Sequence, residues 1–333
     1  MNKKMISSAI FVACYSPSAL VFSEVVHKGI NVSSEINIGA LKVSDRDIAP
    51  WAFDIESNVD GLFILNDELK IKYQLGVNAT RAANDNETDG STWALGSPSD
   101  VTDENVYIRN AKIIMITDYG SLVVAPRTVS GQWMQVYGDL DTFEYNRFHS
   151  QSGNISFFNQ AEQTEDLFAY STPKFGGFQF GTSIVATNEN NGVDGDVWTN
   201  RLTYRNGGLY LAASHTIMQA EALPTNRDYK RSAFAVSYDA GMFKFASVYE
   251  MDRDHPSGDF DVYGINLQFK PNEDWTLNAA YVEKDHDTND TLDKDGAVLG
   301  VKRHFGDSVM LFAETGQYSG APDNIAIGVS LKF

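Results

Sequence analysis

The chain ends with Asn324-Ile325-Ala326-Ile327-Gly328-Val329-Ser330-Leu331-Lys332-Phe333, in which two kinds of side chain alternate strictly. Every second residue from Ile325 to Phe333 is apolar, whereas the residues between them are small or polar. Because alternate residues of a strand point to opposite faces of a sheet, this pattern predicts a strand with one apolar face. A strand of about ten residues is long enough to span a bilayer when tilted.

The same period of two recurs along the chain. From Leu69 to Val77 the odd-numbered residues are apolar or aromatic and their neighbours are polar or glycine, and the stretch from Tyr263 to Phe269 alternates in the same way. Placed by this period, sixteen strands are predicted, at residues 30–43, 51–60, 69–79, 105–116, 121–127, 165–175, 177–186, 196–205, 209–217, 229–238, 242–250, 259–269, 275–283, 295–305, 308–316 and 323–333.

Connections between the predicted strands have two lengths, and short and long ones alternate. The short turns are at 118–120, 206–208, 239–241 and 305–307, whereas the long connections are rich in Asp, Asn and Thr. Outer-membrane barrels have short periplasmic turns and long external loops, while a soluble sandwich has no reason to separate loop lengths by end. The alternation therefore favours a barrel in the outer membrane.

Helical signals are missing after the N-terminal segment. No stretch has a sustained helical spacing of apolar residues, and no second run approaches the roughly 18 apolar residues of a membrane-spanning helix. Backbone groups in lipid must bond one another, so insertion requires a closed barrel. The predicted fold class is therefore all-β, a sixteen-stranded antiparallel transmembrane β-barrel.

Residues 1–23 have the layout of a secretory signal peptide. Two lysines precede a long uncharged run that ends at Phe22, and Ser23 supplies the small residue needed before a cleavage point. Cleavage after Ser23 leaves residues 24–333 as the mature barrel. The alternative is a lipoprotein signal, because Phe-Val-Ala precedes Cys14.

Composition excludes several functions. Cys14 is the only cysteine, so the mature chain is expected to have neither a disulfide nor a thiolate metal site. Removal of the two signal-peptide lysines takes the formal net charge from −18 to −20, which repels nucleic acid. Hydrolase, phosphate-loop and zinc-protease motifs are absent and the six histidines do not cluster, so no enzyme, cofactor or metal is expected.

Two acidic segments are candidate sites. Asp139-Leu140-Asp141 and Asp285-His286 could suggest an outer-membrane aspartyl-type protease, but such enzymes have fewer strands. The loop from Asp285 begins like a calcium-binding loop, yet Asp290 stands where the required glycine belongs. Loose divalent binding that bridges this acidic rim to lipopolysaccharide is the remaining alternative to a solvated loop.

Aromatic residues lie near the ends of the predicted strands, which is typical of the girdles at the two membrane interfaces. They are Tyr73, Phe178, Tyr238, Tyr263, Phe269, Trp275 and Phe333. The fourth strand breaks the pattern, because neither parity of residues 106–113 is purely apolar. A wall buried against another protomer and a misread register both explain this break.

Local strings resemble a known family. Arg109-Asn110-Ala111 leading through residues 118–122 to Arg127, and the hairpin 170–178 with Thr172 as an extra residue, resemble stretches of gammaproteobacterial general porins. The terminal strand ending in Phe333 is similar to that family's barrel-assembly signal. The resemblance spans nearly the whole mature chain and implies a homotrimer in the outer membrane of a Gram-negative bacterium, with the first few strands at the trimer contact.

The resemblance also implies a site. In that family the third long loop folds into the barrel and sets the pore diameter, with acidic loop residues facing a basic wall. Here that loop is about 128–164, with the acidic residues Asp139, Asp141 and Glu144 and the aromatic residues Trp133 and Tyr137. The basic wall would consist of Lys70, Lys72, Arg109 and Arg127. Asp54 and Glu56 depart from the family, which often has arginine there, so a thinner basic wall is expected.

The implied function is passive diffusion of small hydrophilic solutes and ions, and the net charge predicts a weak cation preference. One alternative is a substrate-selective, chitoporin-like sugar channel, because Trp133 and Tyr137 could stack on pyranose rings. Another is a barrel whose loops 80–104 and 284–295 bind host factors or phage.

Overall fold

The computed structural model describes residues 25–84, 106–129, 136, 139–148, 157–160, 163–186, 196–220, 223 and 227–333. The predicted signal peptide, Trp133 and Tyr137 lie outside these residues. No helix among the described residues is long and apolar enough to cross a membrane. Two short helices are present in this part of the chain, α2 (Thr80–Asn84) and the 3-10 helix η3 (Asp290–Leu292).

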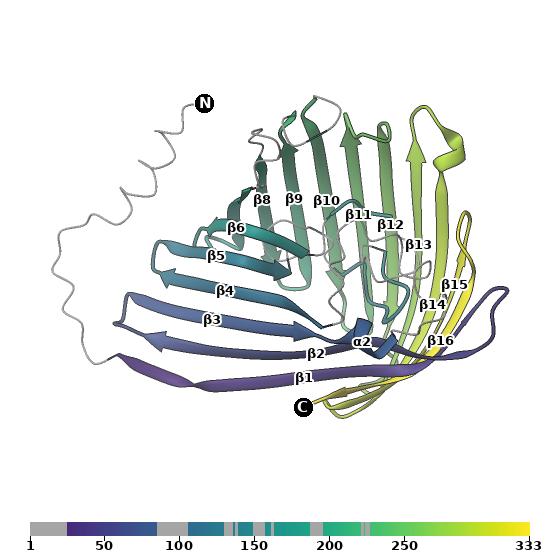
Figure 1. The fold of residues 1–333 in the computed structure, drawn as a ribbon, viewed down its shortest axis with the longest axis horizontal. Coiled ribbons are helices and arrows are strands. Elements are labelled where there is room, and N and C mark those ends of the chain that lie inside the picture. Colours follow the sequence, from purple (N-terminus) through teal and green to yellow (C-terminus); the bar gives the residue numbers. More distant parts are fainter. Residues whose placement is uncertain are drawn as a thin grey trace.

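The described chain forms one closed antiparallel barrel of sixteen strands. Each strand pairs with its neighbour in sequence, and β1 pairs with β16 through Glu35↔Lys332 to Val43↔Asn324. In Figure 1 β1–β5 run across the lower part of the view and β8–β12 run upright. The strands are β1 Val26–Val43, β2 Ala49–Ile64, β3 Leu69–Asn78, β4 Tyr107–Thr117, β5 Gly120–Val129, β6 Gln163–Ser171, β7 Phe178–Ala186, β8 Asp196–Asn206, β9 Leu209–Met218, β10 Tyr229–Asp239, β11 Phe243–Arg253, β12 Phe260–Phe269, β13 Trp275–His286, β14 Lys294–Phe305, β15 Val309–Tyr318 and β16 Asn324–Lys332.

The sequence prediction of sixteen strands is confirmed, and the apolar parity faces outward. In β16 the side chains of Ile325 and Ile327 are 50% and 58% exposed, whereas Ala326 between them is buried. The aromatic residues near the strand ends are also on the outer surface, with Tyr238 54% exposed and Phe333 71% exposed. The outer wall is therefore an apolar band bordered by aromatic rings, as a lipid-facing barrel requires.

A β-bulge explains the irregular parity of β4. The β3–β4 pairing steps from Gly76↔Asn110 to Val77↔Ile108, so Arg109 is an extra residue on β4. An extra residue exchanges the two faces of a strand from that point onward. No single parity of this segment can therefore be apolar, and the bulge accounts for the break in the pattern.

Short turns and long connections lie at opposite ends of the barrel. The short turns include 207–208 between β8 and β9 and 306–308 between β14 and β15. The connection between β5 and β6 starts at the other end, and it spans residues 130–162. Because outer-membrane barrels place short turns in the periplasm, we refer to the first end as the periplasmic end.

Candidate channel lumen

The inner wall is identified by the strand parity opposite to the exposed apolar row. On β12, Tyr263, Ile265 and Leu267 are exposed, whereas Gly264 and Asn266 between them are buried. The described residues of the β5–β6 connection contact this inner parity on β10–β15. We call the described residues 136, 139–148 and 157–160 the docked segment.

Asp139 and Leu140 form the first attachment of the docked segment. The Asp139 carboxylate accepts a hydrogen bond from Ser237 Oγ on β10 at 2.8 Å and pairs with Lys244 Nζ on β11 at 2.7 Å. Asn266 on β12 donates from Nδ2 to the Leu140 carbonyl oxygen at 2.7 Å. Three neighbouring strands therefore hold two consecutive residues of the segment.

The Glu314 carboxylate on β15 forms the second attachment. It accepts hydrogen bonds from the backbone amides of Glu144, Tyr145 and Asn146, at 2.5, 3.2 and 3.3 Å. Glu144 in turn pairs through Oε1 with Lys302 Nζ on β14 at 2.6 Å. Backbone amides of an irregular segment need partners when buried, and here one wall carboxylate satisfies three of them.

Asn159 forms the third attachment. Its backbone amide donates to Glu250 Oε1 on β11 at 2.6 Å, and its side-chain amide donates to Tyr229 Oη on β10 at 2.7 Å. Arg231 on β10 donates a short hydrogen bond to the Asn159 carbonyl oxygen. Both backbone groups of Asn159 are thus bonded to the barrel wall.

An apolar cluster joins these attachments. The docked segment contributes Val136, Leu140, Phe143, Phe148, Phe157 and Phe158, which pack on small and apolar inner side chains of β9–β14 that include Ala233, Ala235, Val262 and Val298. Glycines on the wall make room for these side chains: a Cβ at Gly264 would lie 2.9 Å from Leu140, and one at Gly300 would lie 3.0 Å from the ring of Phe143.

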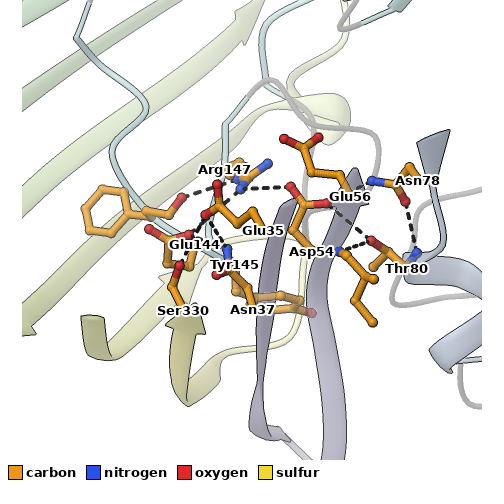
Figure 2. A network of polar contacts seen from close by, with 12 residues as sticks. Glu35, Asn37, Asp54, Glu56, Asn78, Thr80, Glu144, Tyr145, Arg147 and Ser330 are labelled. Carbon is orange, nitrogen blue, oxygen red and sulfur yellow. Dashed lines mark hydrogen bonds and ion pairs between the residues drawn. The ribbon is translucent and has the colours of Figure 1, made fainter. Parts of the chain in front are cut away.

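On the β1–β2 side the docked segment meets a charged network, shown in Figure 2. Arg147 Nη2 lies 4.0 Å from a carboxylate oxygen of Asp54 on β2 and 4.0 Å from one of Glu144. Asp54 also accepts a hydrogen bond from Asn78 Nδ2 at 2.8 Å. Glu144 accepts one from Asn37 Nδ2 on β1 at 3.0 Å. The docked segment therefore follows the inner wall from β10–β15 to β1–β2, with only β16 between β15 and β1 in the barrel.

The electrostatic surroundings keep both loop carboxyl groups ionised. Burial alone raises the pKa of Asp139, but the hydrogen bonds and charge of Lys244, with Ser237, outweigh it and lower the pKa. Burial likewise raises the pKa of Glu144, and the charges of Lys302 and Arg147 reverse the shift to a lowered pKa. The two groups are therefore anionic at neutral pH.

The structure places the predicted wall residues in different surroundings. Lys70 and Lys72 share the inner parity of β3 with the buried Gly76 and Asn78, and Lys72 Nζ lies 3.9 Å from Asp60. Arg109 is bonded to Asp54 at 3.4 Å and forms a short ion pair with Glu56.

Arg127 lies apart from the lumen network. Its guanidinium forms a short ion pair with Glu165 on β6 and donates to the Ile108 carbonyl oxygen. The adjacent Thr128 is buried on the other face, where it accepts a hydrogen bond from Lys112 Nζ at 3.1 Å. Of the predicted acidic residues, Asp141 is half-buried within the docked segment.

Lys302, Glu314 and Arg147 are among the charged residues around the docked segment that the sequence did not predict as site residues, as are Lys244, Glu250 and Arg231. In the sequence, Lys302 and Glu314 are charged residues at the inner parity of β14 and β15. Any water-filled lumen also places charged residues at this parity, so the pattern alone does not single them out. Arg147 lies on the loop that was expected to be acidic, while Asp54 and Glu56 lie on the wall that was expected to be basic. Charges of both signs therefore lie on both sides of the network. Among the described residues no group of three or more His, Cys, Asp or Glu could hold a metal ion.

The family profile described as Gram-negative porin matches residues 19–321, which is most of the chain. The chain belongs to the Gram-negative porin family. Membership places this porin in the outer membrane, where it forms a water-filled channel for passive diffusion of small hydrophilic solutes and ions. No curated protein sequence matches this porin significantly.

Solved outer-membrane proteins share the fold of this porin at low sequence identity. The anion-selective porin from Comamonas acidovorans superposes with a TM-score of 0.69 at 13% identity, covering 92% of this chain and 100% of that one. OmpF of Salmonella typhi, solved with daunomycin, gives 0.67 at 14% identity, covering 91% and 97%. OmpT of Vibrio cholerae, described in a trimer form, gives 0.64 at 16% identity, covering 92% and 100%.

Proposed function

We propose that the docked segment narrows the channel of this porin and so sets the size of the solutes that pass. The observation that carries the proposal is that Glu314 and Asn266, both at inner parity, bond backbone atoms of the segment. A connection whose backbone atoms are hydrogen-bonded to the wall has one position in the lumen, whereas a solvated external loop adopts many positions. Solutes then cross through the space between the segment and the β3–β8 part of the wall, because the segment already contacts β1 and β2.

The lumen charges also support a preference for hydrophilic solutes. Arg109, Arg147 and Lys302 alternate with Asp54, Glu56 and Glu144 around the segment, so paired charges of both signs line this part of the lumen. A surface of interspersed charges favours hydrophilic solutes over apolar ones. With a formal net charge of −18 for the whole chain, we expect a weak cation preference. A reversal potential that favours chloride in a potassium chloride gradient would contradict it.

Membership of the family supports an oligomeric porin, and a homotrimer is proposed because the Vibrio cholerae relative is described in a trimer form. Lipopolysaccharide around the external rim is the second proposed partner. The barrel is proposed to act without catalysis, as a conduit.

Single-channel conductance in a planar bilayer tests this function. The purified protein should give conductance in three equal steps, and maltooligosaccharides and chitooligosaccharides added one at a time should leave the steps unchanged. Saturable block by one sugar would instead indicate a selective channel. Absence of conductance would leave the barrel as a scaffold for its loops, and deletion of residues 284–295 would then be tested for loss of adhesion.

A further inference from the structure

A cavity of about 440 Å³ opens in the lumen next to the docked segment, on β3–β9 and the β6–β7 turn. Its lining includes Lys72 on β3, Lys174 in the turn, and Arg201 and Arg205 on β8. Three of these four cations lie close to short turns, so the cavity belongs to the periplasmic half of the channel. The cavity is separate from the charged network around Glu144 and Arg147, which involves β1, β2, β14 and β15.

The charge of this cavity is opposite to that of the whole chain. Four of the lining residues are Lys or Arg, and no Asp or Glu is among the described residues that line it. The chain as a whole has a formal charge of −18. The nearest described carboxylate to Lys72 is that of Asp60, and its oxygen is 3.9 Å from the ammonium, at the outer limit of an ion pair.

The two arginines are positioned by one buried ring. Arg201, Thr203 and Arg205 share the inner face of β8, because they are two residues apart. The guanidinium of Arg205 lies over the ring of Tyr210 at 4.1 Å from its centroid, and Arg201 Nη2 donates to Tyr210 Oη at 3.3 Å. Tyr210 is 3% exposed, so it is a fixed support. Side chains held in place before binding lose less entropy when a ligand arrives.

We propose that this cavity binds small phosphorylated anions on their way through the channel. Guanidinium groups bind phosphoryl oxygens through paired hydrogen bonds, and lysine ammonium groups supply further charge. Thr203, Ser121 and Ser171 place hydroxyl groups in the same lining. The lining cations, of which Lys72 is also paired with Asp60, match a ligand with two or more negative charges, and the cavity volume suits a diphosphate or a small sugar phosphate.

Binding there concentrates phosphorylated solutes inside a porin whose net charge repels them. The inference goes beyond the proposed size selection, and it does not depend on the docked segment narrowing the channel. An anion-binding cavity is compatible with a weak cation preference in potassium chloride. A saturable site affects only the anions that bind to it, whereas the cation preference concerns all the ions that pass.

The test uses the whole porin in a planar bilayer with potassium chloride, and inorganic pyrophosphate is added to each side in turn. Pyrophosphate should reduce the current saturably, with the lower half-blocking concentration on the periplasmic side. In the R201Q/R205Q double variant that concentration should rise at least about tenfold, because two charge-assisted contacts are lost. Lys174→Gln, in an exposed turn, is a second variant that should raise it without touching the barrel wall.

Lys270→Gln is the matched control, since Lys270 is an exposed lysine in the β12–β13 turn at the same end of the barrel but outside the cavity. Its half-blocking concentration should stay within about twofold of the native value, as expected for an exposed, screened charge. Conductance without pyrophosphate reports the channel itself, so a lost channel and a lost site are distinguishable. A conducting native porin that pyrophosphate does not block, or equal block in all variants, overturns the proposal.

Discussion

Replacing Glu144 by glutamine removes the negative charge that faces Lys302 and nearly keeps the shape of the side chain. The carboxylate oxygen and the ammonium nitrogen are 2.6 Å apart, and the two side chains are 12% and 11% exposed. An exposed ion pair contributes about 0–1 kcal/mol, whereas removing one partner of a buried pair costs about 3–5 kcal/mol. At these exposures the Glu144–Lys302 pair is a buried pair, so the larger cost applies. Because Lys302 regains water once the segment moves away, we expect the lower end, about 3 kcal/mol in docking free energy.

A loss of about 3 kcal/mol raises the undocked population roughly a hundredfold. Hydrogen–deuterium exchange of the backbone amides in residues 143–148 measures this population, because these amides exchange when the segment leaves the wall. The amides of Glu144, Tyr145 and Asn146, which are bonded to Glu314, should therefore exchange about a hundredfold faster in Glu144→Gln.

Two further variants separate the ion pair from other effects. The E144Q/K302M double variant should recover more than half of the loss, since it leaves no unpaired buried charge. Glu273→Gln, in an exposed turn, should exchange like the native porin. Exchange in Glu144→Gln within about threefold of the native rate would refute the reasoning, because it would place the pair among exposed pairs that contribute little.

Three other perturbations act on the same docked segment. Phe158→Ala removes a ring that is 1% exposed and should weaken docking by about 3–5 kcal/mol, seen as faster exchange of residues 157–160 and as added noise in the open-channel current. Gly264→Val places side-chain atoms where a Cβ already lies 2.9 Å from Leu140, so the segment should shift and the single-channel conductance should change, whereas the outward Ile265→Val should leave it unchanged. Because the pKa values of Asp139 and Glu144 are lowered in the folded porin, their contribution to docking is complete above the ordinary carboxyl pKa of about 4 and is lost as the pH falls through the lowered values. Current noise that is the same at pH 3 and pH 7 would contradict this last prediction.

The strand pattern is the part of this protein that the sequence determined by itself. A side-chain period of two, a spanning length of about ten residues and the alternation of short and long connections are local properties, and lipid on the outside makes the apolar parity obligatory. The β4 irregularity was visible in the sequence as well. Its cause was not, because a bulge at Arg109 is defined by the register with β3.

The lumen was decided by the tertiary structure. Asp139 and Glu144 could be picked out as loop carboxylates, but their partners Lys244 and Lys302 lie 105 and 158 residues away, on strands whose inner parity any water-filled barrel would make polar. The small residues Ala233, Ala235 and Gly264 appear in the sequence as weak strand positions, and only the packed segment shows that they make room for its rings. Contacts between a loop and a wall depend on where the closed barrel brings them together, and no local period of the sequence encodes that distance.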